Sequence, residues 1–334
     1  MTRSEPQAEP VQEPAGLIAD LAKAHIAARC LHVIADCGAA DVVGPDGATA
    51  AEIAAHTGMN ADALNRMLRL LAAHGIFTHA ENGRYAHTPA SLLLRTDEPG
   101  SLRSYVRMTA MPAFWDRFTE LPETAQLGRP HHNWASLVDY FAAHPEESAI
   151  FNAAMVSKSR AVLPAVAAAY DFGGYRTIAD IGGGRGHLLK VILERAPRAS
   201  GILFELRHLI ADAEASPRLT LLPGDFFADP LPRADVYLLM DLIHDWDDAD
   251  AARILAAVRQ AAPTESRLLV IETLVAETPG PHFGKTLDII MLAVTGGRER
   301  TETQYAALLT AAGFRLERVL PTASQYSIVE AVAV

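Results

Sequence analysis

Hydrophobic and polar positions follow two different periods along the 334-residue chain. Between about residues 16 and 87, apolar residues recur every three or four positions, which is typical of amphipathic helices. From about residue 175 onward, apolar runs of strand length alternate with helical segments. The pattern therefore predicts a mostly helical N-terminal module followed by a C-terminal α/β domain.

Local signals divide the N-terminal module into elements. The predicted order is a helix over 16–40, a helix capped by Thr49 and ended by Gly58, a helix capped by Asn60 and ended by Gly75, and a hairpin of 76–78 with 84–87 around Asn82-Gly83. This order is typical of a winged helix, which either binds DNA or serves as a dimerisation module. The candidate recognition helix carries only Arg66 and Arg69, which favours dimerisation.

The C-terminal pattern predicts a doubly wound, Rossmann-like α/β domain. Strand-like runs cover 176–182, 200–206, 219–225, 234–243, 266–275 and 324–334, and helical segments cover 187–196, 251–262 and 302–314. We therefore expect a disordered tail over 1–14, a winged-helix-like dimerisation domain over 15–100, connecting helices over 101–165 and the α/β domain over 166–334.

Composition narrows the class of protein. The net charge is −11, with 29 basic against 40 acidic residues, which argues against a nucleic-acid partner. The two cysteines, Cys30 and Cys37, exclude a disulfide framework and fit reduced thiols in a cytoplasmic protein. The first residues, MTRSEPQAEPVQEP, lack the apolar core of a signal peptide, and no apolar run approaches the roughly 18 residues of a membrane helix.

The stretch DIGGGRG joins the first predicted strand of the α/β domain to a helix. Gly182, Gly184 and Gly186 depart from the dinucleotide fingerprint, whose third glycine would fall at His187. Asp180 precedes the turn, and a carboxylate suits the ammonium and sulfonium of S-adenosylmethionine better than it suits a pyrophosphate. The turn therefore favours S-adenosylmethionine as the cofactor.

Two further acids follow the next strands. Glu205 lies about 20 residues downstream of the turn, where a carboxylate binds ribose hydroxyls in such folds. Asp225 ends the following strand, and Phe226 beside it offers an apolar face to adenine. The alternative is an α/β protein whose strands are simply followed by solvent-facing acids.

The stretch LLMDLIHDWDDADAARIL places His244 after a strand, at the sheet edge where α/β active sites gather. Its aspartates do not follow a calcium loop, and those at 247, 248 and 250 fit the start of a helix. Glu272, at the end of a strand, and Glu302, at the start of a helix, are candidate partners for the imidazole. A carboxylate on one ring nitrogen would let the other accept a proton from a phenol. A structural or surface histidine is the alternative.

These motifs together resemble the class I S-adenosylmethionine-dependent O-methyltransferases of the plant caffeic-acid and bacterial natural-product types. DIGGGRG, GDFF, LIHDWDD and GGRERTE occur in that order, and the resemblance covers nearly the whole chain. It implies a homodimer formed through the N-terminal domain and His244 as general base, flanked by Glu272 and Glu302. It implies cofactor contacts at Asp180, Gly182, Gly184, Gly186, Glu205, Asp225, Phe226, Met240 and Ser159.

The resemblance also implies an acceptor pocket. Its expected residues are Trp115, Phe151, Asn152, Met155, Asp288 and Met291, although core packing explains Met155 and Met291 equally well. Plant members often carry a lysine where this chain has Met240, and Glu205 replaces a commoner aspartate, so plant substrates do not carry over.

The sequence thus predicts an O-methyltransferase for a hydroxyl group of a small aromatic or polyketide-like natural product. S-adenosylmethionine would be converted to S-adenosylhomocysteine without a metal, because the cysteines form no ligand set and His131-His132 fits a surface loop. N-methylation is one alternative. Hydroxylase, decarboxylase or pericyclic chemistry on the same scaffold is another, and a DNA-binding regulator is a remote third.

Overall fold

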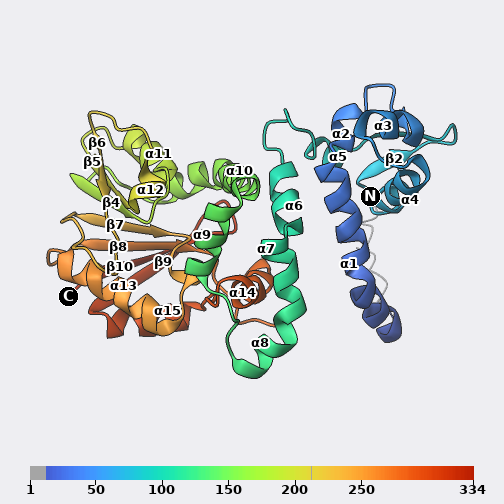
Figure 1. Cartoon of the computed structure of the whole chain (residues 1–334). Coiled ribbons are helices and arrows are strands. Elements are labelled where there is room, and N and C mark those ends of the chain that lie inside the picture. Colours follow the sequence, from blue (N-terminus) through green and yellow to red (C-terminus); the bar gives the residue numbers. More distant parts are fainter. Residues whose placement is uncertain (1–12, 212) are drawn as a thin grey trace, which may run out of the picture. The chain divides into compact units, whose positions relative to one another are not determined.

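The computed structural model describes residues 13–211 and 213–334 (Figure 1). The described residues fall into two compact units, which divide between Ala110 and Met111. The disordered tail predicted over 1–14 lies outside the described residues except at its end, where Pro14 already begins a helix. Within the described residues, no helix is long and apolar enough to span a membrane.

The N-terminal unit has the predicted order of helices and hairpin. Its elements are α1 (Pro14–Asp36), α2 (Ala39–Val42), β1 (Ala48–Thr49), α3 (Ala50–Thr57), α4 (Ala61–Ala73), β2 (Phe77–His79), β3 (Arg84–His87), α5 (Pro89–Leu92) and α6 (Arg103–Ala110). Thr49 caps α3 in a reciprocal capping box with Glu52, Gly58 ends α3 in the left-handed conformation, and Asn60 caps α4. The three strands pair antiparallel in the order β1-β3-β2.

Helix α6 belongs to this N-terminal unit, which extends past the predicted boundary at residue 100. The guanidinium of Arg103 donates to the carbonyl oxygens of Ala35, at 2.7 Å, and Asp36, at 3.2 Å, near the end of α1. Helix α1 also leaves large apolar side chains exposed, at Leu17, Ile18, Leu21 and Ile26.

The C-terminal unit begins with helices that precede its sheet. They are α7 (Pro112–Trp115), the 3-10 helix η1 (Asp116–Glu120), α8 (Leu121–Leu127), α9 (Trp134–Ala143) and the long α10 (Pro145–Ala169). Aromatic rings join them, because Phe151 of α10 lies 4.7 Å from Phe141 and 6.1 Å from Phe114 between ring centroids. The second half of α10 packs on the sheet through Val162, Leu163, Val166 and Ala167.

The sheet has seven strands in the order β6-β5-β4-β7-β8-β10-β9. They are β4 (Thr177–Ile181), β5 (Ser200–Glu205), β6 (Leu219–Pro223), β7 (Val236–Met240), β8 (Arg267–Glu272), β9 (Phe314–Pro321) and β10 (Ser327–Ala333). The first five are parallel, and β10 pairs antiparallel with both β8 and β9. Strand β9 was not predicted from the sequence.

Helices cover both faces of this sheet, as a doubly wound fold requires (Figure 1). On one face α10 and α11 (His187–Arg195) pack on Leu238, and on the other α13 (Asp248–Ala261) and α15 (Glu302–Ala311) pack on Leu239. The remaining helices are α12 (Arg207–Ile210), the 3-10 helix η2 (Ile243–Asp245) and α14 (Phe283–Val294). The parallel strands bring the ends of β4, β5, β7 and β8 to one edge, where the site forms.

Candidate active site

The glycine turn connects β4 to α11 with backbone geometry that glycine favours. Gly182, Gly184 and Gly186 all have positive φ, of 68°, 58° and 71°. A Cβ on Gly182 would lie 2.9 Å from the Leu242 side chain, whereas nothing lies within 4 Å of the corresponding position on Gly184. The turn therefore packs closely against Leu242, just after β7, at Gly182 and leaves open space at Gly184.

Two buried carboxylates lie under this turn. Glu205, at the end of β5, accepts the N–H of Gly184 at 2.9 Å and that of Leu206 at 2.7 Å. Asp180 is 1% exposed, and among the described residues neither of its carboxylate oxygens has a hydrogen-bond partner. Burial, and then the neighbouring Glu205 charge, raises the pKa of Asp180 to about 7. The cradle is thus acidic and suits a cationic ligand.

The expected adenine-side residues follow β6. The Asp225 carboxylate accepts the N–H of Phe227 at 2.8 Å, which folds the short turn after the strand. Phe226 lies edge-on to Phe227, with 4.8 Å between ring centroids, and to Trp246, at 6.0 Å. The indole nitrogen of Trp246 is buried without a hydrogen-bond partner among the described residues. These rings form an apolar wall beside the expected cofactor residues.

His244 lies in η2, just beyond β7, and its carboxylate partner is Glu299. The imidazole Nδ1 lies 2.6 Å from Glu299 Oε1, and both side chains are buried. The expectation that Glu302 flanks His244 is therefore wrong. Thr301 caps α15, so Glu302 falls in the first turn of that helix and is exposed to solvent. Glu299 precedes the cap, in the buried loop that reaches His244.

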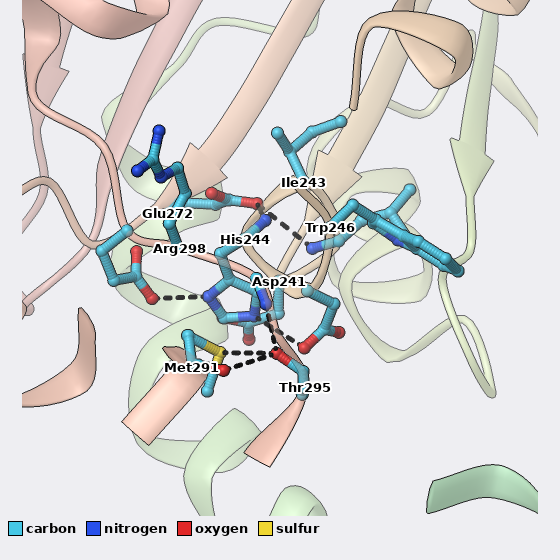
Figure 2. A network of polar contacts seen from close by, with 12 residues as sticks. Asp241, Ile243, His244, Trp246, Glu272, Met291, Thr295 and Arg298 are labelled. Carbon is cyan, nitrogen blue, oxygen red and sulfur yellow. Dashed lines mark hydrogen bonds and ion pairs between the residues drawn. The ribbon is translucent and has the colours of Figure 1, made fainter. Parts of the chain in front are cut away.

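Glu272, the other expected partner, holds the backbone of the His244 turn (Figure 2). Its Oε1 accepts the N–H groups of Leu242, at 3.2 Å, and His244, at 3.1 Å. Its Oε2 accepts a short hydrogen bond from the hydroxyl of Tyr305 in α15. Glu272 therefore fixes the position of the turn and adds negative charge beside the ring.

The loop before α15 packs directly against the same turn. A Cβ on Gly297 would lie 2.0 Å from the carbonyl oxygen of His244, so glycine is the residue that fits there. The N–H of Arg298 donates to that oxygen at 2.9 Å. The buried Arg300 donates to the carbonyl oxygens of Ile243, at 3.2 Å, and Trp246, at 3.1 Å. The motif GGRER thus clamps the histidine turn through backbone contacts.

The electrostatics of the site favour a charged imidazole. Burial alone would lower the pKa of His244, but the carboxylates of Glu272, Asp245 and Glu299 outweigh it and raise the pKa to about 10. Burial raises the pKa of Asp245 to about 7, against the opposing effect of His244. The site is therefore built to stabilise a proton on the ring.

The remaining nitrogen of His244 has carboxylates nearby but no hydrogen bond to them. Nε2 lies 3.9 Å from Asp241 Oδ1 and 4.0 Å from Asp245 Oδ1. Asp241 is in turn bound by Lys158, at 3.1 Å, and by the hydroxyl of Tyr326, at 2.8 Å. Sequence reasoning missed Asp241, Lys158 and Tyr326, because Asp241 and Tyr326 are 85 residues apart.

His244, Glu272 and Glu299 each offer a ligand atom within 4.8 Å of the others, a spacing that a metal ion could use. Most of the polar atoms of these three side chains have hydrogen-bond partners, whereas Oε2 of Glu299 is buried without one among the described residues. Nδ1 pairs with Glu299, and both oxygens of Glu272 accept hydrogen bonds from Tyr305 and the backbone. His244 therefore has the contacts of a hydrogen-bonded base.

The other expected residues lie on three helices and at the end of β7. Phe151, Met155 and Ser159 are half-buried on α10, Asn152 is exposed there, Trp115 is half-buried at the end of α7, and Met240 ends β7. Asp288 and Met291 lie on α14 and support the site, because Asp288 accepts the N–H of Glu299 at 2.9 Å and Met291 packs beside Thr295. The roles of Ser159 and Met240 toward the cofactor, and of the other residues toward an acceptor, stay a prediction.

Comparison with known protein families agrees with this geometry. Residues 118–315 match the O-methyltransferase domain, and residues 19–97 match the O-methyltransferase dimerisation domain. Over 312 residues the chain is 39% identical to the phenazine O-methyltransferase PhzM of Lysobacter antibioticus, covering 91% of this chain and 92% of that protein. Over 305 residues it is 36% identical to the mitomycin biosynthesis 6-O-methyltransferase of Streptomyces lavendulae, covering 88% and 87%.

Solved structures give the same result. The crystal structure of LaPhzM superposes with a TM-score of 0.87 at 36% identity, covering 97% of this chain and 100% of that one. An O-methyltransferase of neocarzinostatin biosynthesis, solved with S-adenosylmethionine and 2-hydroxy-5-methyl naphthoic acid, gives 0.81 at 31% identity, with coverages of 97% and 100%. With its dimerisation domain, its seven-stranded α/β domain and these relatives, the chain belongs to the O-methyltransferase family of methyltransferase enzymes.

Proposed function

We propose that this enzyme methylates a hydroxyl group of a small aromatic or polyketide-like natural product, with His244 as the general base. The observation that carries the proposal is the 2.6 Å contact between Nδ1 of His244 and Glu299, at the sheet edge that also holds the glycine turn. A histidine in this setting can take up a proton from the acceptor.

S-adenosylmethionine fits the cradle around the glycine turn. Asp180 and Glu205 are buried acids, which suit a ligand with an ammonium and a sulfonium and would repel a pyrophosphate. Gly184 leaves open space over its Cα, so a ligand can approach the backbone there. Phe226 and Trp246 offer aromatic faces for a base. The structure of the related neocarzinostatin enzyme in complex with this cofactor supports the same assignment.

The tautomer of His244 follows from its partner. When Nδ1 donates its proton to Glu299, the lone pair on Nε2 is free to accept the proton of a substrate hydroxyl. The proton ends on the ring as imidazolium, which Glu299, Glu272 and Asp245 stabilise. A phenol has a pKa of about 10, which matches the pKa of about 10 for His244. The carboxylates around the ring therefore favour proton transfer from a phenol to His244.

S-adenosylmethionine supplies an electrophilic methyl group on a positively charged sulfur, and that charge disfavours the imidazolium form before proton transfer. The residues of this chain then position the acceptor oxygen at Nε2 and keep the base in its reactive orientation. Glu272 contributes by holding the backbone N–H of His244 in place.

The class of acceptor is inferred from the relatives and the helices. Related enzymes are named for phenazine, mitomycin and 3-amino-4-hydroxybenzoate, all of which are cyclic and unsaturated. Phe151 and Met155 lie half-buried on α10, where Phe151 offers an aromatic face and Met155 an adaptable apolar contact to an aromatic ring. The dimerisation domain and the exposed apolar side chains of α1 support a homodimer.

The experiment that tests the proposal follows a deuterated methyl group. Wild type, His244→Ala and His131→Ala are incubated with methyl-deuterated S-adenosylmethionine and a panel of phenols, hydroxylated heterocycles and polyketide-like aromatics. We expect label on an acceptor oxygen with wild type and with His131→Ala, whose exposed histidine pairs with Glu123. We expect a loss of roughly 10²–10⁴-fold in His244→Ala, with cofactor binding retained.

Two results would contradict this proposal. Near-wild-type turnover by His244→Ala would show that His244 is not the general base. Label on a nitrogen would favour N-methylation instead, which a relative named 8-amino-8-demethylriboflavin N,N-dimethyltransferase, 32% identical over 316 residues, carries out. Such a nitrogen needs no general base if it already carries a lone pair.

A further inference from the structure

Three side chains from separate elements meet beside His244. Lys158 comes from α10, Asp241 follows β7 directly, and Tyr326 precedes β10. The Lys158 ammonium lies 3.1 Å from one carboxylate oxygen of Asp241. The Tyr326 hydroxyl lies 2.8 Å and 2.9 Å from the two oxygens of the same carboxylate. Lys158 therefore binds the Oδ2 oxygen, whereas Oδ1 faces the imidazole, and Tyr326 donates to both oxygens.

The backbone conformation of Asp241 is also unusual. Its φ is +50°, in the left-handed region that residues other than glycine rarely adopt. This conformation directs the side chain toward the His244 ring (Figure 2). Its nearer oxygen stops 3.9 Å from Nε2, which is beyond hydrogen-bonding distance.

An unrestrained carboxylate at this distance would compete with the substrate. Nε2 is the nitrogen that must receive the hydroxyl proton, because Nδ1 is occupied by Glu299. A movement of about 1 Å would let Asp241 form a charge-assisted hydrogen bond to the imidazolium, which has an optimum near 2.8 Å. That contact would both block Nε2 and hold the ring in its protonated form.

We propose that Lys158 and Tyr326 are positioning residues that hold the Asp241 carboxylate away from Nε2 of His244, so that this nitrogen stays available to the substrate hydroxyl. This inference rests on the proposed role of His244 as general base. Lys158 also offsets the negative charge of Asp241, and Tyr326 supplies a neutral donor that fixes the carboxylate plane.

The other charges around His244 come from each element that packs on it. Asp245 lies on the same turn, Glu272 at the end of β8 and Glu299 in the loop before α15. Arg300 donates to the carbonyl of Ile243, and its charge is paired with Asp248. Tyr305 of α15 is bound to Glu272, and Asp288 of α14 to the backbone of Glu299. Among the charged groups named here, Lys158 is the cation that pairs with the carboxylate facing Nε2.

The test measures kcat/KM against pH for Lys158→Met, Asp241→Asn, the double variant, Lys158→Arg and Tyr326→Phe. In Lys158→Met, the acidic limb should move to higher pH by about one unit, with a loss of roughly tenfold at neutral pH. Adding Asp241→Asn should restore most of that loss, because the competing carboxylate is gone. Lys158→Arg should retain most activity, and Tyr326→Phe should show a smaller shift in the same direction as Lys158→Met.

Lys190→Met is the matched control, because its ammonium pairs loosely with the exposed Glu214, at 3.9 Å. It should leave the pH profile unchanged. If the double variant is no more active than Lys158→Met, or if only the acceptor KM rises without a pH shift, Lys158 contacts the acceptor or supports the fold and the inference is wrong. His244→Ala is measured alongside, so a failure of the base assignment is seen separately.

Discussion

The imidazole of His244 and the carboxylate of Glu299 lie 2.6 Å apart, and the two side chains are only 6% and 0% exposed. Glu299→Gln keeps a hydrogen-bond acceptor but removes the charge that stabilises imidazolium. We expect kcat to fall by roughly 10–10³-fold with little change in cofactor affinity. Glu302→Gln is the control three residues away and should retain near-wild-type kcat, because Glu302 is exposed. Steady-state kinetics of both variants decide the assignment, and the reverse ranking would contradict it.

The pH dependence of the enzyme should have an alkaline optimum. The base works when neutral, and the carboxylates around His244 raise its pKa to about 10. In the free enzyme kcat/KM should therefore climb with pH well beyond the ordinary histidine value of about 6.5. Glu299→Gln lowers the pKa of His244, so its acidic limb should move to lower pH. An unchanged limb in that variant would show that another group controls the profile.

We expect the ionised Asp180 to lower the free energy of unfolding and to strengthen the binding of the cofactor. Its pKa of about 7 in the folded protein lies above the value near 3.9 of an unfolded chain. The ionised carboxylate therefore destabilises the fold, with the full penalty above pH 7 and none below the unfolded pKa. Asp180→Asn should raise the unfolding free energy at pH 8 by about 1–3 kcal/mol.

The same variant should bind S-adenosylmethionine at least about tenfold more weakly, since an opposite charge is lost. Calorimetric titration and denaturant unfolding measure the two effects. Asp139→Asn, on the exposed side of α9, is the control and should change neither. Destabilisation together with intact binding would remove Asp180 from the cofactor site.

Gly297 should tolerate no side chain. A methyl group there would lie 2.0 Å from the carbonyl oxygen of His244, so the loop or the histidine turn must move. We expect Gly297→Ala to reduce kcat at least about tenfold and to cost about 1–3 kcal/mol of stability. Gly174→Ala, where nothing lies within 4 Å, should be close to neutral in both kinetics and thermal unfolding.

We expect Arg300 to act mainly by holding the backbone of the His244 turn, and less through its charge. Its guanidinium reaches Asp248, at 2.8 Å, as well as two carbonyl oxygens of the turn, and lysine cannot reproduce that fork. We expect Arg300→Lys to lower kcat by roughly tenfold and to lower the melting temperature. Arg298→Lys is the matched control, because its exposed side chain pairs with the same Asp248 at 2.9 Å. Equal losses of kcat in the two variants would contradict the proposed role of Arg300 in holding the histidine turn.

Elements fixed by local signals could be predicted from the sequence. The caps at Thr49 and Asn60, and the left-handed Gly58, act within one helical turn, so α3 and α4 were placed correctly. The glycine turn and Glu205 are likewise joined over 21 residues by one strand and one helix. Continuous apolar runs predicted the parallel strands, which are buried on both faces, whereas β9 follows α15 so closely that the predicted helix ran into it.

The partner of His244 could not be chosen by residue type, because GGRERTE offers two glutamates. The signal that separates them is the capping box of Thr301 with Gln304, which starts α15 after Thr301 and turns Glu302 to solvent. The set of Lys158, Asp241 and Tyr326 had no such local signal. It depends on the antiparallel return of β10 beside β8, a long-range pairing that periodicity does not report.

The spacing of contacts along the chain has a consequence for biosynthesis. The two buried acids of the cofactor cradle lie within residues 180–205, whereas the partner of His244, Glu299, comes 55 residues after it and the partner of Asp241, Tyr326, comes 85 residues after it. Domains fold as units while the nascent chain lengthens from its N-terminus. The α/β unit therefore cannot complete the site until its last strand, β10, has been synthesised, so catalytic competence is acquired only at the end of translation.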